Sequence, residues 1–184
     1  AAAGVQPAVV GGDRQPVAAI SISGQMAGVM GVGADGLAVT PYDSWLDTRC
    51  GKYRDMILAH GEDKVVALTG APVTYAHGPK IVWWKHERPE TYSRIDKFVQ
   101  PAGYAAMRLC GLAGKDGFID HTYLHFAGFA DTANKRWSTD LLAALDIAPE
   151  RMPAIVKPSD RVGGLTRAMA EQCGLKEGTP VVAG

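Results

Sequence analysis

The sequence has little that would bind nucleic acid, cross a membrane or cross-link the chain. Its 19 Lys and Arg residues equal its 19 Asp and Glu residues, and no basic run is present, which argues against a nucleic-acid partner. No apolar run approaches the roughly 20 residues that cross a bilayer, and the first residues lack the charged-then-apolar order of a signal peptide. The three cysteines, Cys50, Cys110 and Cys173, are widely spaced. They favour a reducing cytoplasm over a disulfide framework or a zinc knuckle.

Three common chemical motifs are also missing. The stretch at Gly114 and Lys115 lacks the first glycine and the hydroxyl of a P-loop. Ser23 lacks the glycine two places earlier that a hydrolase nucleophile elbow requires. His121 and His125 are four residues apart, but no glutamate motif or third ligand accompanies them. We therefore expect no metal site here, and interpret these histidines as polar residues of a loop or a partly buried turn.

The string GVGADG, residues 31–36, matches the G-x-G-x-x-G dinucleotide fingerprint. That fingerprint binds a pyrophosphate only where a helix opens directly after the glycines. The next residues are β-prone and end at Pro41, so no helix is expected there. We interpret residues 34–36 as a hairpin turn, in which Gly36 can adopt a positive φ. A dinucleotide-dependent oxidoreductase stays as a less favoured alternative, distinguished by whether a helix follows Gly36.

The 184 residues are 47% hydrophobic, enough for a sizeable core in one domain. Helical and strand-like segments alternate, which favours an α/β fold. Strands are predicted at 17–23, 27–33, 37–40 and 179–184, with those of 17–40 adjacent and antiparallel in a mixed sheet. Helices are predicted from Thr48 to His60, from Pro79 to Glu87, and from Ala102 to Leu109, with Pro89 ending the second. Two further helices are predicted after capping residues, from Thr139 to Leu145 after Ser138 and through Cys173 after Thr166. The helices that contain Trp83 and Ala105 should pack on the sheet, with Trp83 and Trp84 in the core and at an interface edge.

Several segments, in order along the chain, resemble those of the FGGY carbohydrate kinases, and most closely their xylulokinase-like members. AISISGQM at 19–26 resembles the family's A-I-G-I-S-G-Q-M-H-G strand, WLDTR at 45–49 its W-x-D-x-R segment, and PKIVWWK at 79–85 its P-K helix. Further matches are RWS at 136–138, Leu141-Leu142, Val162-Gly163 and GTPVVAG at 178–184. Each match is weak alone, but together they occur in the family's order and cover nearly the whole chain.

The resemblance implies an actin-like, ribonuclease-H-like ATPase fold with a mixed β-sheet flanked by helices. Members of this family have two such domains around a cleft, and residues 1–184 correspond to the N-terminal, sugar-binding domain. The family's D-x-G-T-[TS]-S phosphate hairpin should precede Ala1, and its catalytic aspartate should follow Gly184. We therefore expect the chain alone to be inactive, and ATP and Mg²⁺ to be bound mainly by parts outside it. The resemblance is also compatible with a cytoplasmic homodimer.

The resemblance assigns substrate contacts to six residues: Gln25, Met26, Ala27, Trp45, Asp47 and Tyr75. Gln25 and Met26 end the sugar-side strand, and Ala27 stands where xylulokinases usually have histidine, which puts a pentulose substrate in doubt. Trp45 would form an apolar wall, Asp47 would accept hydrogen bonds from vicinal hydroxyls, and Tyr75 matches a substrate-contacting tyrosine of glycerol kinases. Alternatively, Met26 and Trp45 are core residues and Asp47 forms only a local polar contact near Arg49.

These features predict an ATP-dependent kinase that phosphorylates a hydroxyl of a ketose or polyol, with a xylulose-like sugar favoured. The second hypothesis is a non-catalytic sugar-binding or assembly module on the same actin-like domain. The missing phosphate hairpin and aspartate are the evidence for that alternative.

Overall fold

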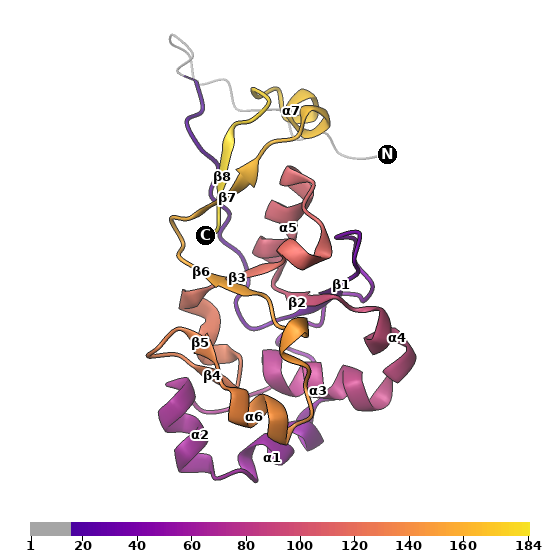
Figure 1. Cartoon of the computed structure of the whole chain (residues 1–184), viewed down its shortest axis with the longest axis vertical. Coiled ribbons are helices and arrows are strands. Elements are labelled where there is room, and N and C mark those ends of the chain that lie inside the picture. Colours follow the sequence, from indigo (N-terminus) through magenta and orange to yellow (C-terminus); the bar gives the residue numbers. More distant parts are fainter. Residues whose placement is uncertain (1–15) are drawn as a thin grey trace.

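The computed structural model describes residues 16–184 (Figure 1). At its centre, β1 (Met30–Val32) pairs antiparallel with β2 (Lys97–Val99), with Met30 opposite Val99. All three residues of β1 are buried. Such a strand is covered on both faces, which explains its continuous apolar character.

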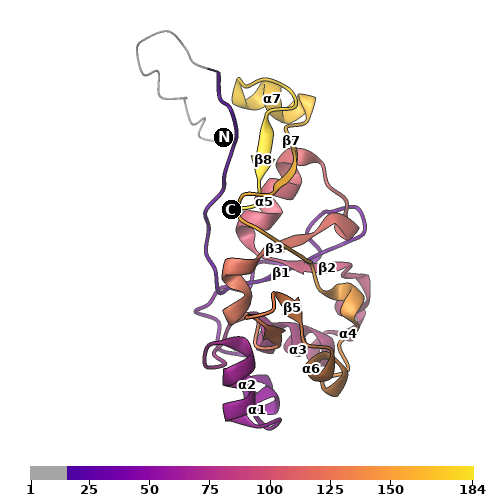
Figure 2. The ribbon, with the colours of Figure 1, turned by 60° about the vertical axis from the view of Figure 1, so that its left-hand side comes forward.

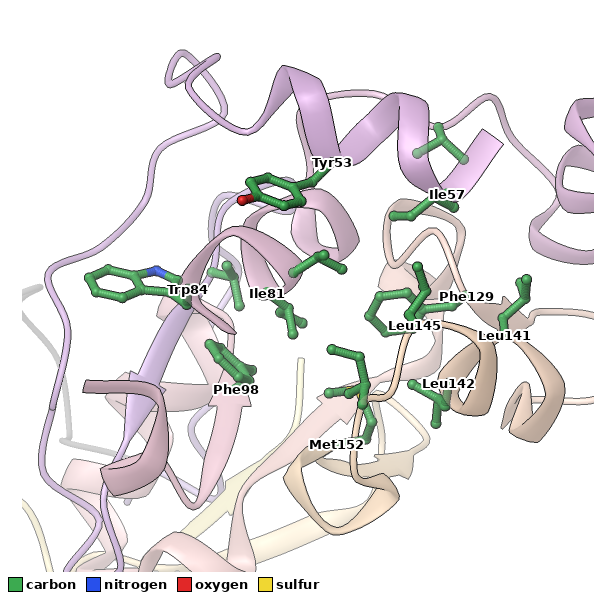
Figure 3. Close-up of a cluster of buried hydrophobic side chains, with 14 of the residues drawn as sticks. Tyr53, Ile57, Ile81, Trp84, Phe98, Phe129, Leu141, Leu142, Leu145 and Met152 are labelled. Carbon is green, nitrogen blue, oxygen red and sulfur yellow. The ribbon is translucent and has the colours of Figure 1, made fainter. Parts of the chain in front are cut away.

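One face of this ladder packs against α3 (His77–Glu87). Phe98 of β2 contributes to the same buried cluster as Ile81 and Trp84 of α3 (Figure 3). Tyr53 and Ile57 of α1 (Gly51–Leu58) extend this cluster, as do Leu141 and Leu142 of α6 (Thr139–Ala144). The predicted burial of Trp84 is confirmed, while Trp83 is only partly buried at the edge of the cluster.

The other face of the ladder packs against α5 (Pro101–Cys110). Met30, Val32 and Val99 form a second buried cluster with Ala106 and Met107 of this helix. Adjacent residues Phe98 and Val99 thus belong to opposite clusters, as the alternation of side chains along a strand requires. The prediction that the helices containing Trp83 and Ala105 flank the central strands is confirmed.

The other strands of residues 16–184 are two to four residues long and pair two by two. β3 (Phe118–Asp120) is parallel to β6 (Ala154–Val156). β4 (Ala130–Asp131) pairs antiparallel with β5 (Arg136–Trp137). β7 (Arg161–Gly164) pairs antiparallel with β8 (Pro180–Val182). The remaining helices are α2 (Glu62–Thr69), α4 (Pro89–Arg94) and α7 (Arg167–Cys173), with short 3₁₀ helices at Gly114–Asp116, His121–Phe126 and Pro149–Arg151. The α/β class is confirmed. None of the helices in the described range is long and apolar enough to span a bilayer.

The hairpin interpretation of the glycine-rich string is confirmed. The Gly36 N–H donates to the Gly33 carbonyl at 2.9 Å, and the Gly33 N–H donates to the Leu37 carbonyl at 2.8 Å. Gly36 has φ +74°, and Val32 bridges Ala38 in antiparallel fashion. No helix opens directly after Gly36, since the next one begins at Gly51, so the dinucleotide-dependent oxidoreductase alternative is wrong.

The predicted strand at 17–23 is wrong as a regular element. Only Ile20 pairs, and its parallel bridge is to Val181 of β8, not to β1. The segment runs in extended form along one side of the molecule (Figure 2). Most of its residues are exposed, so no second strand covers them. Its partner lies near the other end of the chain, and local alternation of residues carries no information about so distant a pairing.

The helix predictions hold in place but differ at their ends. The helix predicted from Thr48 begins at Gly51, and Pro89 follows Arg88 as the first residue of α4. A proline at a first helical position has no N–H to lose, so it begins one helix as readily as it stops another. The Ser138 and Thr166 side chains cap α6 and α7 by accepting from the backbone N–H groups of Leu141 and Met169, as predicted.

Candidate functional site

Gln25, Met26 and Ala27 lie where the extended segment bends before β1. Gln25 is exposed, and its Oε1 accepts a hydrogen bond from the Tyr42 hydroxyl. Met26 is 42% exposed, and its carbonyl oxygen contacts Nε2 of His77. The core interpretation of Met26 is therefore wrong, because its side chain is available to a ligand.

The second segment, residues 44–50, contains Trp45 and Asp47. Trp45 is 52% exposed, so it is not a core residue either. Asp47 accepts from the backbone N–H and from Nε of Arg49, each at 3.0 Å. The local contact considered for Asp47 is thus present. A carboxylate has about four acceptor positions, so this contact leaves Asp47 able to accept from hydroxyls as well.

Tyr75 lies on the third segment, just before α3. Its ring lies beside α1, with the Arg54 guanidinium carbon 5.4 Å from the ring centroid. Its carbonyl oxygen accepts from Nζ of Lys80 at 2.6 Å. The same ammonium donates to the carbonyl oxygen of Asp47, also at 2.6 Å. Lys80 therefore joins the segment of Tyr75 to that of Asp47.

The first turn of α3 consequently contacts all three segments that contain the predicted residues. His77 binds the carbonyl group of Met26, and Lys80, three residues later, binds those of Asp47 and Tyr75. Residues three apart lie on the same side of a helix. Two side chains of one helical turn, His77 and Lys80, thus bind backbone carbonyl groups of all three segments and bring the segments of the six predicted residues together.

His77 is 2% exposed, and burial lowers its pKa to about 4, from an ordinary value of 6.5. The neutral ring must carry its proton on Nε2, since only a donor can bind the carbonyl oxygen of Met26. Nδ1 has no hydrogen-bond partner within residues 16–184. The ring is therefore an uncharged donor that holds the segment of Met26.

Asp43, which directly precedes the segment of Trp45, forms a second set of polar contacts. Its buried carboxylate accepts from Nε1 of Trp84 and from the guanidinium of Arg49, whose carbon lies 4.0 Å from the Trp83 ring centroid. Burial raises the pKa of Asp43, and the Trp84 and Arg49 contacts oppose that shift. Since Arg49 also binds Asp47, these contacts hold the segment of residues 44–50 to the buried carboxylate of Asp43.

Two surface hollows do not involve the six predicted residues. These hollows, of about 410 and 330 Å³, lie one between Arg94 and Arg151 and the other between α2 and α6. Residues 16–184 also contain no cluster of three His, Cys, Asp or Glu side chains able to hold a metal.

Sequence comparison assigns the chain to a known protein family. The family model described as "FGGY family of carbohydrate kinases, N-terminal domain" matches residues 7–184. The chain belongs to the FGGY family of carbohydrate kinases. It is 30% identical over 172 residues to the xylulose kinase of Escherichia coli strain K12, an alignment that includes 92% of this chain and 34% of that kinase. It is also 30% identical over 175 residues to the xylulose kinase of Bacillus subtilis strain 168, covering 90% of this chain and 32% of that protein.

Solved structures place the chain in the FGGY fold. It superimposes on a kinase from Brucella ovis, titled "xyloylose kinase", with a TM-score of 0.77 and 28% identity over 91% of this chain and 34% of that one. The xylulose kinase of Rhodospirillum rubrum gives a TM-score of 0.80 at 25% identity, again over 91% of this chain and 34% of that one. The actin-like, ribonuclease-H-like fold is confirmed. The chain spans about a third of the length of the curated FGGY relatives that it matches.

Sequence reasoning missed His77, Tyr42 and Asp43, and took Lys80 only as part of a family motif. One signal was available for Lys80, because it directly precedes the apolar run Ile81–Trp84 in a helix that sequence placed in the core. A lysine there is either at the edge of the buried face or bound to internal acceptors. His77 and Asp43 gave no such signal.

Proposed function

We propose that residues 1–184 are the N-terminal, sugar-side domain of an ATP-dependent kinase that phosphorylates a hydroxyl of a ketose or polyol, with a xylulose-like sugar favoured. The observation that carries the proposal is the convergence of the three segments around Gln25, Trp45 and Tyr75 on the first turn of α3, in a chain that matches the family along its length. The xylulose kinases among its relatives support the choice of sugar class.

In this proposal, the described residues bind and orient the sugar. Gln25 offers both an amide donor and an acceptor, and Asp47 accepts from vicinal hydroxyls. Met26 and Trp45 provide exposed apolar surface against the carbon face of the sugar. Holding the reacting hydroxyl in line with a phosphoryl group lowers the entropic part of the barrier.

The second wall of the cleft, the general base and the ATP site belong to other parts of the family's two-domain architecture. Mg²⁺ would accompany ATP there, where it neutralises charge on the phosphates. We further propose a cytoplasmic enzyme, compatible with a homodimer, that binds neither nucleic acid nor membrane. The balance of 19 basic and 19 acidic side chains supports the lack of a nucleic-acid partner.

Sugar-dependent ADP release by the full-length polypeptide tests this proposal. It should be measured with D-xylulose, other ketoses and polyols, each at saturating ATP, with an aldose as the control. Release that depends on one ketose or polyol supports the kinase. Sugar binding by calorimetry without any ADP release would instead favour the non-catalytic binding module.

A further inference from the structure

Lys80 is a buried cation held by backbone carbonyl groups. It is 2% exposed, and its Nζ lies 2.6 Å from the carbonyl oxygens of Asp47 and Tyr75 and 3.7 Å from Sγ of Cys50. None of the ion pairs found within residues 16–184 includes Lys80. The ammonium group is thus solvated by two backbone carbonyl dipoles, and it also contacts the Cys50 thiol, which stays neutral because burial raises its pKa.

This arrangement is poorly explained by stability alone. Moving an ammonium group out of water is costly, and a well-packed apolar side chain often stabilises a buried position as well as, or better than, buried charge does. What Lys80 supplies, and an apolar residue cannot, is one fixed point for two segments. Both carbonyl oxygens lie 2.6 Å from the same nitrogen, so they are no farther apart than twice that distance.

The two carbonyl groups that Lys80 binds belong to two of the predicted substrate residues. Trp45 lies two residues before Asp47, so the apolar wall and the carboxylate share the segment that Lys80 holds. His77, three residues earlier on the same turn, holds the segment of Met26 in the same manner. A displacement of Lys80 would therefore change the spacing between Asp47 and Tyr75 without removing either side chain.

We propose that Lys80 is a positioning residue that sets the distance between the segments of Asp47 and Tyr75, and through it the fit of the sugar. The inference rests on the proposed kinase function. It assigns Lys80 no contact with the sugar or with ATP, since its ammonium is closed to solvent and its donors face protein acceptors.

The same helix offers a matched control. Lys85 also binds backbone carbonyl oxygens, those of Leu145 at 3.1 Å and of Asp146, but these lie near the end of α6 and away from the three segments. Lys80→Met and Lys85→Met each remove an ammonium group that joins α3 to another part of the chain. Only the first removes one that joins substrate segments.

The test compares both variants with the wild-type full-length polypeptide, using the best ketose or polyol substrate. Lys80→Met should lower kcat/KM for the sugar by about 10- to 100-fold, the loss typical of substrate groups displaced by about 1 Å, while KM for ATP stays unchanged. Lys85→Met should leave both parameters at wild-type values. Thermal unfolding of each variant establishes that it is folded at the assay temperature.

Equal sugar kinetics in the two variants, or a parallel change in the KM for ATP, would overturn the positioning role while leaving the kinase function intact. A wild-type polypeptide that phosphorylates no ketose or polyol would overturn the proposed function, and with it the substrate role of Lys80. If Lys80→Met does not fold, Lys80→Gln carries the test. Its shorter, uncharged amide can reach one carbonyl group at most, so a selective loss of sugar kinetics is again expected and wild-type kinetics would refute the inference.

Discussion

The indole Nε1–H group of Trp84 donates a hydrogen bond to the buried carboxylate of Asp43, 41 residues earlier in the sequence. Asp43 is 3% exposed and also accepts from Arg49. The bond joins α3 to the residue directly before the segment of Trp45 and Asp47, and Arg49 of that segment binds the same carboxylate. It therefore couples the main core to the candidate site.

Replacing Trp84 by Phe should destabilise the chain, because the carboxylate of Asp43 loses a donor that water cannot replace. Leaving a buried acceptor short of a donor costs about 1–3 kcal/mol. The neighbouring Trp83→Phe variant is the control, since Trp83 is only partly buried and a phenyl ring can still face the Arg49 guanidinium. Urea unfolding measures both, and equal losses would show that the Asp43 bond contributes nothing specific.

The stability of the chain should fall as the pH falls from 6.5 to 4, through protonation of His77. Burial lowers the pKa of the folded ring to about 4, and His125 and Lys80 add to that shift. The unfolded chain then binds a proton that the folded chain excludes, so this contribution is complete above pH 6.5 and is lost on acidification, amounting to roughly 3 kcal/mol.

His77→Gln separates this effect from other titrations. The Gln amide can still donate to the carbonyl group of Met26, but it does not titrate. The difference in unfolding free energy between wild type and variant should change between pH 6.5 and 4. Parallel curves for the two proteins would contradict the assignment to His77.

Gly36→Ala should be more destabilising than Gly70→Ala. Both glycines have positive φ, +74° and +80°, which costs an alanine roughly 1–2 kcal/mol. A Cβ on Gly36 would also collide with the carbonyl oxygen of Leu112, whereas nothing lies within 4 Å of one on Gly70. Thermal or urea unfolding compares them directly. Equal losses would mean that the hairpin is not packed against Leu112.

Ala27→His should raise kcat/KM for D-xylulose relative to the native substrate of the full-length enzyme. Alanine offers no polar partner to a hydroxyl at this position, and an unpartnered buried hydroxyl costs about 1–3 kcal/mol, or roughly 5- to 150-fold in kcat/KM. Steady-state kinetics with D-xylulose and with the native substrate measure the ratio. A native substrate that proves to be D-xylulose, together with a lower kcat/KM in Ala27→His, would show that other groups hold the sugar.

Gln25→Ala is the companion variant, and it should weaken every sugar tested. Its amide is the predicted polar contact common to all substrates, and the loss of one neutral hydrogen bond costs about 0.5–1.5 kcal/mol. Tyr42→Phe is the control, because it removes the hydroxyl that binds Gln25 while keeping the amide. A selective loss for one sugar in Gln25→Ala would argue against a common contact.

The local elements follow from the amino-acid sequence alone. The Ser138 and Thr166 caps, the turn at Gly36 and the helix containing Trp83 follow from side-chain chemistry within a few residues, so they could be predicted. The family motifs likewise assign substrate contacts to the segments of Gln25, Trp45 and Tyr75, and that assignment stays a prediction. Helix ends were less certain, since Pro89 can stop one helix or begin the next.

The contacts that join those segments depend on the folding of the whole chain. The pairing of Ile20 with Val181, the bond between Asp43 and Trp84, and the contacts of His77 and Lys80 all link residues far apart in the sequence. Apart from the contact between Lys80 and Tyr75, which are five residues apart, no local pattern encodes them, because packing of whole elements brings the partners together. A buried lysine or histidine acquires its role from the carbonyl groups that folding places around it, and those become known only in three dimensions.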